Sequence, residues 1–582
     1  MEVKNILECD VLVAGGGTAG MMAAISAADA GSSVILIEKA NTRRSGAGST
    51  GNDHFQCYIP EVHGSYDEFM KLYLHDRPGP GACKDRDLMD AFAKESFDVV
   101  KQWQSWGIQM MPHGEWEFTG HTLPWILGTH LKYEGVNQKP IFTNEARKRG
   151  VKILNRHPLT EILTDDDGSV CGAIAVDLSA DPPKFQVIRC KSLILCTAKG
   201  KRLTGDNRIG WAQYGPESGV GTAAAYRAGA RIVNAGVTGG ESGPNIGVSR
   251  YFEYGGTRTW VGVYTDIEGK PYAPIGEITT YDVLNPKTPG EPHVITRPGW
   301  ETGEYTQYLP ENKMKEAYAN GQPVFMNFSY NTPEDTEYMK WALQHEGSSG
   351  IVKHLEDEGF DFDRKMLEFA TARDVGGGRP GGPDVINDRQ ETTVAGLYAA
   401  GECMGNNLPG LSPAAVGGRI AGRNAAKYSQ TKELQPAEES PVVEECLQRY
   451  SRYLANECST ANPTWEEINV AIIQVMWDYC GSGILSDELF DVGWQHLKRI
   501  EGKMKDMQAA APHDLMQCLA VEDVAQNAEL AMTAGRFRKE SRGAYRYKGY
   551  PEPDPAYNSN YVAVQKIDGK PAAFLRPHRK EV

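Results

Sequence analysis

Three glycines near the start of the chain have the spacing of a phosphate-binding turn. Gly15, Gly17 and Gly20 form the pattern Gly-x-Gly-x-x-Gly, and Glu38 follows at about the separation expected for an acid that binds a ribose hydroxyl. The first glycine permits a tight turn, the second lets the backbone approach a diphosphate, and the third lets a helix pack close to the preceding strand. The chemistry that these residues suit is therefore the binding of a dinucleotide.

The residues around this turn predict the elements that position it. An apolar run at 10–14 leads into the glycines, an alanine-rich segment at 21–30 follows them, and a second apolar run at 34–38 ends at the acid. This order predicts a strand, a turn, a helix whose N-terminus faces the anion, and a second strand. Glycine-rich turns alone are common, but here every element of the unit occurs in register. We therefore predict a Rossmann-type unit.

Length and composition narrow the class of protein. A chain of 582 residues predicts about three or four domains. The net charge of −15 argues against nonspecific binding of nucleic acid. No apolar run approaches the ~20 residues of a membrane helix, and the first residues, Met-Glu-Val-Lys-Asn, lack the pattern of an export signal. We expect a cytoplasmic enzyme with no direct membrane span.

The 11 cysteines are scattered along the chain, and none belongs to a Cys-x-x-Cys pair. An odd number in a cytoplasmic chain predicts reduced thiols rather than disulfides. Iron–sulfur clusters and structural zinc need closely spaced thiolates, so we expect no metal site. If electrons pass through iron and sulfur, another polypeptide carries the cluster.

A loop of small residues follows Glu38. It begins at Lys39, continues through Arg44-Ser45-Gly46, and is too rich in glycine for a helix or a core strand. The Glu-Lys pair followed by Arg-Ser-Gly-Ala resembles the flavoprotein subunits of the succinate dehydrogenase and fumarate reductase family, and within it most closely the alpha subunit of adenylylsulfate reductase. In many members a histidine of this loop binds the flavin covalently, and Gly46 stands at the matching position. The resemblance therefore implies FAD held without a covalent bond.

Further segments carry the same resemblance. The strand that ends in Thr197-Ala198-Lys199-Gly200 is similar to the Ala-Thr-Gly-Gly element of the family, from which Lys199 departs. A Gly-Leu-Tyr-Ala-Ala-Gly-Glu segment ending at Gly401-Glu402 is the sharpest match in the chain, and in the family the helix start after it can face the flavin. The resemblance assigns FAD contacts to Gly15, Gly17, Thr18, Ala19, Gly20, Glu38, Lys39, Arg44, Ser45, Gly46, Gly51, Asn52, Leu159, Thr160, Thr197, Ala198, Lys199, Gly200, Gly401, Glu402, Ser412, Ala414 and Ala415.

The resemblance spans nearly the whole chain and implies an α/β fold. It comprises a Rossmann-type FAD-binding domain, an inserted α+β capping domain and a C-terminal helical domain. We place the FAD-binding domain at 1–234 and 371–432, the capping domain at 235–370, and the helical domain with a terminal hairpin at 433–582. The capping domain is expected to close over the flavin and to supply substrate contacts.

Candidate catalytic residues come from the capping region and from the edges of the flavin site. Arg250 and Arg258 lie near paired glycines and are candidates to clamp an anionic substrate or to deliver a proton. The alternative is that each is a surface ion-pair residue. His54, Gln56 and Arg379 are candidates near the isoalloxazine, and the family places residues of the 54–56 segment over the flavin ring. A loop dense in tryptophan and histidine, within 110–130, either binds a ligand or fills a lid.

The chain departs from the family at two substrate-binding positions. Fumarate reductases carry a histidine where this chain reads Ala-Arg-Asp-Val at 372–375, and an Asn-Arg pair where it has the segment 406–413. Two dicarboxylate-binding side chains are thus missing, which disfavours fumarate and succinate as substrates. The histidine that adenylylsulfate reductases would have near Leu408 is also absent, which argues against adenylylsulfate.

The leading hypothesis is an FAD-dependent oxidoreductase that moves a hydride or an electron pair between flavin N5 and a small polar, anionic substrate. The resemblance implies a separate ferredoxin-like iron–sulfur partner. A second hypothesis is an electron-transfer flavoprotein that serves as one subunit of a larger complex. A third is an oxidase that uses oxygen, as the related L-aspartate oxidases do. The substrate, the reaction direction and the oligomeric state stay open.

Overall fold

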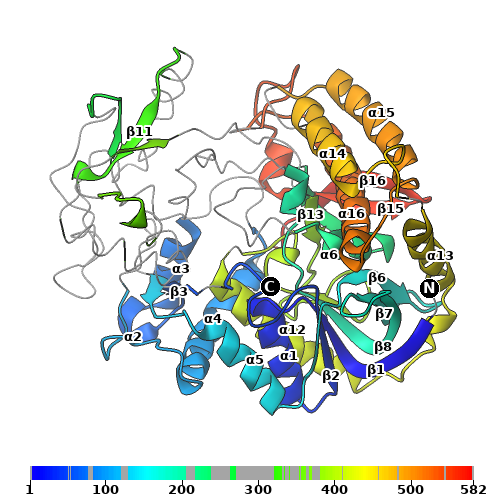
Figure 1. Cartoon of the computed structure of the whole chain (residues 1–582). Coiled ribbons are helices and arrows are strands. Elements are labelled where there is room, and N and C mark those ends of the chain that lie inside the picture. Colours follow the sequence, from blue (N-terminus) through cyan, green and yellow to red (C-terminus); the bar gives the residue numbers. More distant parts are fainter. Residues whose placement is uncertain are drawn as a thin grey trace.

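The structure is a computed structural model (Figure 1). It describes residues 3–49, 51–52, 54–75, 83–118, 129–204, 217–236, 263–270, 317, 320–330, 333, 340, 353, 356–361, 366–369, 380–408, 410–456, 458–480, 484–542 and 545–579.

A seven-stranded sheet forms the centre of the nucleotide-binding part. Its strands lie in the order β5 (Lys152–Asn155), β2 (Val34–Glu38), β1 (Val3–Ala14), β8 (Lys184–Leu195), β7 (Val170–Asp177) and β6 (Leu159–Thr164), and β14 (Leu397–Ala399) pairs with β8. The pairs of β1 with β2 and β8, of β2 with β5 and of β8 with β14 are parallel, whereas β6, β7 and β8 form an antiparallel meander. The predicted strand–turn–helix–strand unit and the α/β fold are confirmed.

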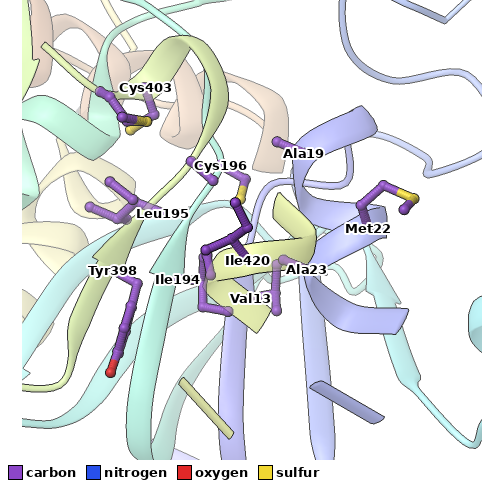
Figure 2. Close-up of a cluster of buried hydrophobic side chains, with 14 of the residues drawn as sticks. Val13, Ala19, Met22, Ala23, Ile194, Leu195, Cys196, Tyr398, Cys403 and Ile420 are labelled. Atoms are coloured by element: carbon purple, nitrogen blue, oxygen red, sulfur yellow. The ribbon is translucent and has the colours of Figure 1, made fainter. Parts of the chain in front are cut away.

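Two helices from distant parts of the chain, α1 (Thr18–Asp29) and α12 (Leu411–Ser429), pack on this sheet. Two more helices lie against them: α5 (Gln138–Lys148) contacts α1, and α4 (Arg86–Ser105) contacts α12. A Cβ at Gly418 would overlap the Ala19 carbonyl oxygen, and one at Gly422 would overlap that of Ala23, so α12 lies directly against α1. Figure 2 shows Ala23 of α1 close to Ile420 of α12, with the strand residues Val13 and Ile194 next to them. The two predicted pieces of the FAD-binding domain thus share one core.

The C-terminal helices share a second core with β6, β7 and β8. They are α13 (Pro441–Ala455), α14 (Trp465–Cys480), α15 (Asp487–Met504) and α16 (Pro512–Phe537) (Figure 1). The ring of Phe185 on β8 lies 5.6 Å from that of Tyr450 on α13. A capping box precedes α14: the Thr464 amide donates to Glu467 Oε2 at 2.8 Å, and the Glu467 amide donates to Thr464 Oγ1 at 3.3 Å.

Smaller sheets complete the described fold. One has the order β13 (Pro380–Pro383), β9 (Ile232–Ala235), β15 (Asn560–Ile567) and β16 (Lys570–Pro577); another is β10 (Val263–Thr265), β11 (Val324–Asn327) and β12 (Met366–Phe369); a third pairs β3 (His54–Gln56) with β4 (His130–Lys132). Short helices are α2 (Pro60–His63), α3 (Tyr66–His75), α6 (Val220–Arg227) and the 3₁₀ turns Lys201–Thr204, Phe328–Tyr330, Gly401–Cys403, Ala437–Glu439 and Pro555–Asn558.

The predicted terminal hairpin is present as β15–β16, and it pairs with β9 rather than standing apart. Among the described helices, none combines the length and the apolar character that crossing a bilayer requires.

A buried arginine attaches this hairpin to the nucleotide-binding part. Arg576 of β16 donates to Asp85 Oδ1 at 2.7 Å and to Asp384 Oδ1 at 2.7 Å, and both aspartates are fully buried. Asn406 Nδ2 donates to Asp85 Oδ2 at 2.6 Å and to the Val385 carbonyl at 2.8 Å. Asn406 is therefore held in a structural network.

A second buried charge cluster joins the sheet to the C-terminal helices. Arg227 of α6 donates to Glu161 of β6 at 2.7 Å and to Asp523 of α16 at 3.1 Å. Arg449 of α13 donates to the other oxygen of Glu161 at 2.9 Å and pairs with Glu522 at 3.4 Å. Burial raises the pKa of Asp523 to about 7, against the lowering effect of Arg227.

Candidate cofactor site

The predicted phosphate turn has the conformation that its glycines allow. Gly15 has a φ of +100°, and a Cβ there would overlap the Cys196 carbonyl oxygen at the end of β8. A Cβ at Gly20 would overlap the Gly15 carbonyl oxygen. At Gly17, in contrast, a Cβ would meet nothing closer than Gly46 Cα at 3.8 Å. The first and third glycines thus let β1, β8 and α1 pack together, and the second leaves space at the start of α1.

The carboxylate of Glu38 fixes this turn. Its Oε2 accepts a hydrogen bond from the Gly16 amide at 2.6 Å, and its Oε1 accepts one from the Ala40 amide at 2.8 Å. Glu38 is 5% exposed. A carboxylate has about four acceptor sites, so these two bonds leave capacity for a ribose hydroxyl, and that contact stays a prediction.

The loop after Lys39 folds back over the turn. Ser45 Oγ donates to the Gly16 carbonyl at 3.3 Å, and Gly46 packs against Gly17 with a φ of +85°. A Cβ at Gly46 would lie 2.9 Å from Gly17 Cα, so no histidine fits this backbone without a shift. Arg44 is exposed, whereas Gly51 and Asn52 are buried. The Asn52 carbonyl accepts a hydrogen bond from the Gly135 amide at 2.9 Å.

One buried hydroxyl at the start of α1 has no partner. Thr18 Oγ1 is shielded from solvent and forms no hydrogen bond within the described part of the chain. A helix N-terminus with free donors and a spare hydroxyl is suited to a phosphate. The predicted FAD diphosphate fits the residues present here.

Residues from the C-terminal half of the chain lie close to the start of α1. A Cβ at Gly401 would lie 3.0 Å from the Ala19 Cβ and 3.2 Å from the Ala414 Cβ, so Gly401 fits between α1 and α12. Ser412 Oγ accepts a hydrogen bond from the Gln56 amide at 2.7 Å. Glu402 is half-buried and Ala415 is buried. The structure therefore brings together predicted residues from three separate stretches of sequence.

The segment after β8 lies beside Gly401. The Cys196 amide donates to the Ala14 carbonyl at 2.8 Å, and Thr197 Oγ1 lies 3.5 Å from Cys403 Sγ. Ala198 has a φ of +57°, while Lys199 is half-buried and Gly200 is buried. Figure 2 shows Cys196 and Cys403 within the cluster of buried side chains. Burial raises the pKa values of both thiols, so both stay protonated.

Two more predicted FAD contacts lie at the start of β6. The chain between β5 and β6 returns to Glu38, whose carbonyl accepts a hydrogen bond from the His157 amide at 2.8 Å. Leu159 and Thr160 follow and are buried. Thr160 Oγ1 donates a hydrogen bond to the Ile174 carbonyl at 3.1 Å and so joins β6 to β7. A contact of Thr160 with FAD stays a prediction.

Two of the five catalytic candidates belong to the described residues. His54 and Gln56 lie on β3 opposite β4, where the His54 ring is 5.1 Å from the ring of buried His130. Arg250, Arg258 and Arg379 lie outside the described residues. Within the histidine-rich loop, His113 contacts Glu117 at the surface, and 119–128 also lie outside the described residues.

Lys139 is a residue of this site that the sequence did not reveal. It lies near the start of α5, is fully buried, and donates a hydrogen bond from Nζ to the Gly16 carbonyl. Burial lowers its pKa to about 8, while the charge of Glu38 acts in the opposite direction. A lysine beside a proline at a helix start carries no sequence signal of burial.

Comparisons with known proteins agree with this geometry. Residues 10–244 match the family model described as FAD binding domain, and residues 471–575 match that described as fumarate reductase flavoprotein C-term. The chain is 24% identical to a subunit of the fumarate reductase (CoM/CoB) of Methanothermobacter marburgensis, over 97% of this chain and 98% of that protein. It is 23% identical to the fumarate reductase flavoprotein subunit of Haemophilus influenzae, over 99% of this chain and 95% of that protein.

Solved structures share the fold over its full length. Adenylylsulfate reductase from Archaeoglobus fulgidus superposes with a TM-score of 0.73 at 20% identity, covering 100% of this chain and 97% of that chain. Quinol fumarate reductase from E. coli gives a TM-score of 0.71 at 18% identity, covering 100% of this chain and 98% of that chain.

Fold and site together define an FAD-dependent flavoprotein oxidoreductase. In sequence the chain is similar to the flavoprotein subunits of fumarate reductases, and it shares the fold of adenylylsulfate reductase.

Proposed function

We propose that this chain transfers a hydride or an electron pair between flavin N5 and a small anionic substrate held beneath the segment 235–370. The observation that carries this proposal is the convergence of Gly17, Gly46 and Gly401 with the N-termini of α1 and α12. Bound FAD would supply the redox chemistry, because its isoalloxazine accepts and donates electron pairs. The chain's own residues orient the cofactor and neutralise charge around it.

Residues of both chain halves would hold the parts of FAD. Gly17 and Thr18 would meet the diphosphate, and Gly401 with Ser412 would meet the flavin side. Negative charge on a reduced isoalloxazine would be favoured by the N-terminus of α12. Because Gly46 replaces the histidine of related proteins, FAD would be bound without a covalent bond.

The substrate contacts in this proposal come from Arg250 and Arg258, with His54, Gln56 and Arg379 at the edges of the flavin. The planar guanidinium forms paired hydrogen bonds with carboxylates and oxoanions, which suits an anionic substrate. Asn406 is held in place by Asp85 and Val385, so it is engaged elsewhere than in substrate binding. This agrees with a substrate other than fumarate or succinate.

A separate iron–sulfur protein would exchange electrons with the flavin. All 11 cysteines are free thiols, ten of them buried, and the described residues hold no cluster of metal-ligand side chains. The relatives from Methanothermobacter marburgensis and Haemophilus influenzae are both named as subunits of fumarate reductases. A ferredoxin-like partner is therefore proposed, and the cytoplasmic location expected from the sequence is part of the same proposal.

An oxidase is the second candidate function. L-aspartate oxidase of Vibrio cholerae is 20% identical over 94% of this chain and 96% of that protein. Such an enzyme would return the electrons to oxygen and would need no iron–sulfur partner.

Anaerobic and aerobic assays of the purified holoprotein distinguish these candidates. A reductase accepts electrons from a reduced viologen dye and passes them to an anionic substrate, and Arg258→Gln lowers turnover while FAD stays bound. Arg536→Gln, on the half-exposed end of α16, is the matched surface control and leaves turnover unchanged. Peroxide release with L-aspartate would support the oxidase instead. If a panel of carboxylates and oxoanions gives neither reaction, the proposed chemistry is wrong even though FAD is bound.

A further inference from the structure

A buried cation lies directly beneath the phosphate turn. Lys139 is 0% exposed, and its ammonium donates a hydrogen bond to the Gly16 carbonyl. The Gly16 amide, on the other side of the same residue, donates to Glu38 at 2.6 Å. Gly16 is thus held by a cation at its carbonyl and by an anion at its amide.

The bond to the carbonyl has a consequence for the next amide. The Gly16 carbonyl and the Gly17 N–H belong to one peptide unit, so a cation at the oxygen polarises the N–H at the opposite end. Gly17 is the residue beside which the structure leaves space at the start of α1. Lys139 therefore strengthens the Gly17 N–H as a donor at the start of α1.

The charges around Lys139 are few. Glu38, at the end of β2, is the group whose charge favours the ammonium form. On α5 itself Glu145 pairs with Lys148 and Arg149, and Asp29 of the neighbouring α1 pairs with Arg149. Without Lys139, Lys39 would be the lysine whose charge still acts on Glu38, and this carboxylate would be less well compensated beside a bound diphosphate.

We propose that Lys139 is a positioning residue of the FAD site, which offsets the charge of Glu38 and orients the Gly17 amide toward the diphosphate. Lys139 has this role only if the turn binds FAD, as proposed above. The lysine acts through Gly16 and touches no reacting atom.

This arrangement links FAD binding to a proton. Burial holds the pKa of Lys139 at about 8 in the free protein, and an anionic ligand nearby raises it. Above that pH, FAD binding must take up a proton, so affinity falls as the pH rises, by up to about tenfold per pH unit. Below it, affinity is independent of this group. An arginine at the position stays charged and shows no such fall.

The test is a titration of apoprotein with FAD, followed by flavin fluorescence, at about pH 7 and about pH 9.5. At the lower pH, Lys139→Met binds FAD about 10- to 100-fold more weakly than the wild type, because a hydrogen bond to a charged group is lost. Lys148→Met, an exposed lysine on the same helix, binds like the wild type.

Other outcomes of these titrations would overturn either the role of Lys139 or the assignment of FAD. If Lys139→Met binds FAD as tightly as the wild type, the inference is wrong. If wild-type affinity is the same at both pH values and Lys139→Arg is as weak as Lys139→Met, the lysine acts by packing alone and the inference is again wrong. If Lys139→Met does not fold, the pH dependence of FAD binding by the wild type and the FAD affinity of Lys139→Arg still test the role of Lys139. A wild type that does not bind FAD at all would instead overturn the cofactor assignment.

Discussion

Replacing Gly46 by alanine tests how the loop closes over the phosphate turn. Gly46 has a φ of +85°, and a Cβ there would lie 2.9 Å from Gly17 Cα. The variant therefore adds one methyl group between the loop and the residue expected to face the diphosphate. It removes no polar group, so its effect isolates the fit of two backbones.

The expected size follows from two costs. A side chain in the left-handed region costs about 1–2 kcal/mol. The methyl must also move about 0.5 Å to reach ordinary van der Waals contact, which begins at 3.4 Å. The free protein can relieve this by tilting the loop outward, but the FAD complex needs the loop in place. We expect FAD to bind with a free energy weaker by roughly 2 kcal/mol, or about 30-fold in affinity.

The assay is the titration of apoprotein with FAD, with Gly31→Ala as the matched control. Gly31 has a similar φ of +89°, but a Cβ there meets nothing within 4 Å. Gly31→Ala should lower thermal stability through backbone strain and leave FAD affinity unchanged. Equal FAD affinities for Gly46→Ala and the wild type would refute the close packing of Gly46 on Gly17.

Two further predictions concern the buried charges. Arg576→Met removes one cation from Asp85 and Asp384, which keep Arg579 and Arg231 as partners, and should lower the free energy of unfolding by about 1–3 kcal/mol, against less than about 1 kcal/mol for Arg536→Met, measured by urea denaturation; similar losses in both variants would contradict the Arg576 network. Burial raises the pKa of Asp523 from 3.8 to about 7. Between these two pH values, the folded protein holds a proton on this carboxyl that the unfolded chain has already lost. Wild-type stability should therefore fall relative to Asp523→Asn between about pH 4 and about pH 7 and level off above, and parallel stability curves would show that Asp523 has an ordinary pKa.

Local rules predicted the elements of the nucleotide-binding part. The glycine spacing predicted the turn because Gly15 and Gly20 have no room for a side chain. The capping box from Thr464 to Glu467 was predictable because both of its hydrogen bonds join residues three apart. Residue type and near spacing decide such features.

The contacts between distant segments were not predictable in this way. Lys139 has the sequence context of an exposed helix residue, and its burial depends on the loop after Glu38 folding over the turn. Arg576 joins Asp85 and Asp384 only because β15 pairs with β9. Both depend on tertiary packing, for which neither periodicity nor composition carries a signal.

The most direct measurement is the absorption spectrum of the purified protein before and after acid precipitation. A single pocket formed by α1, the Gly46 loop and α12 predicts a yellow protein with about one FAD per chain, and the flavin passes into the supernatant on precipitation. A colourless protein that takes up no added FAD, with its glycines intact, would contradict the shared pocket. A flavin that stays with the precipitate would contradict the role of Gly46.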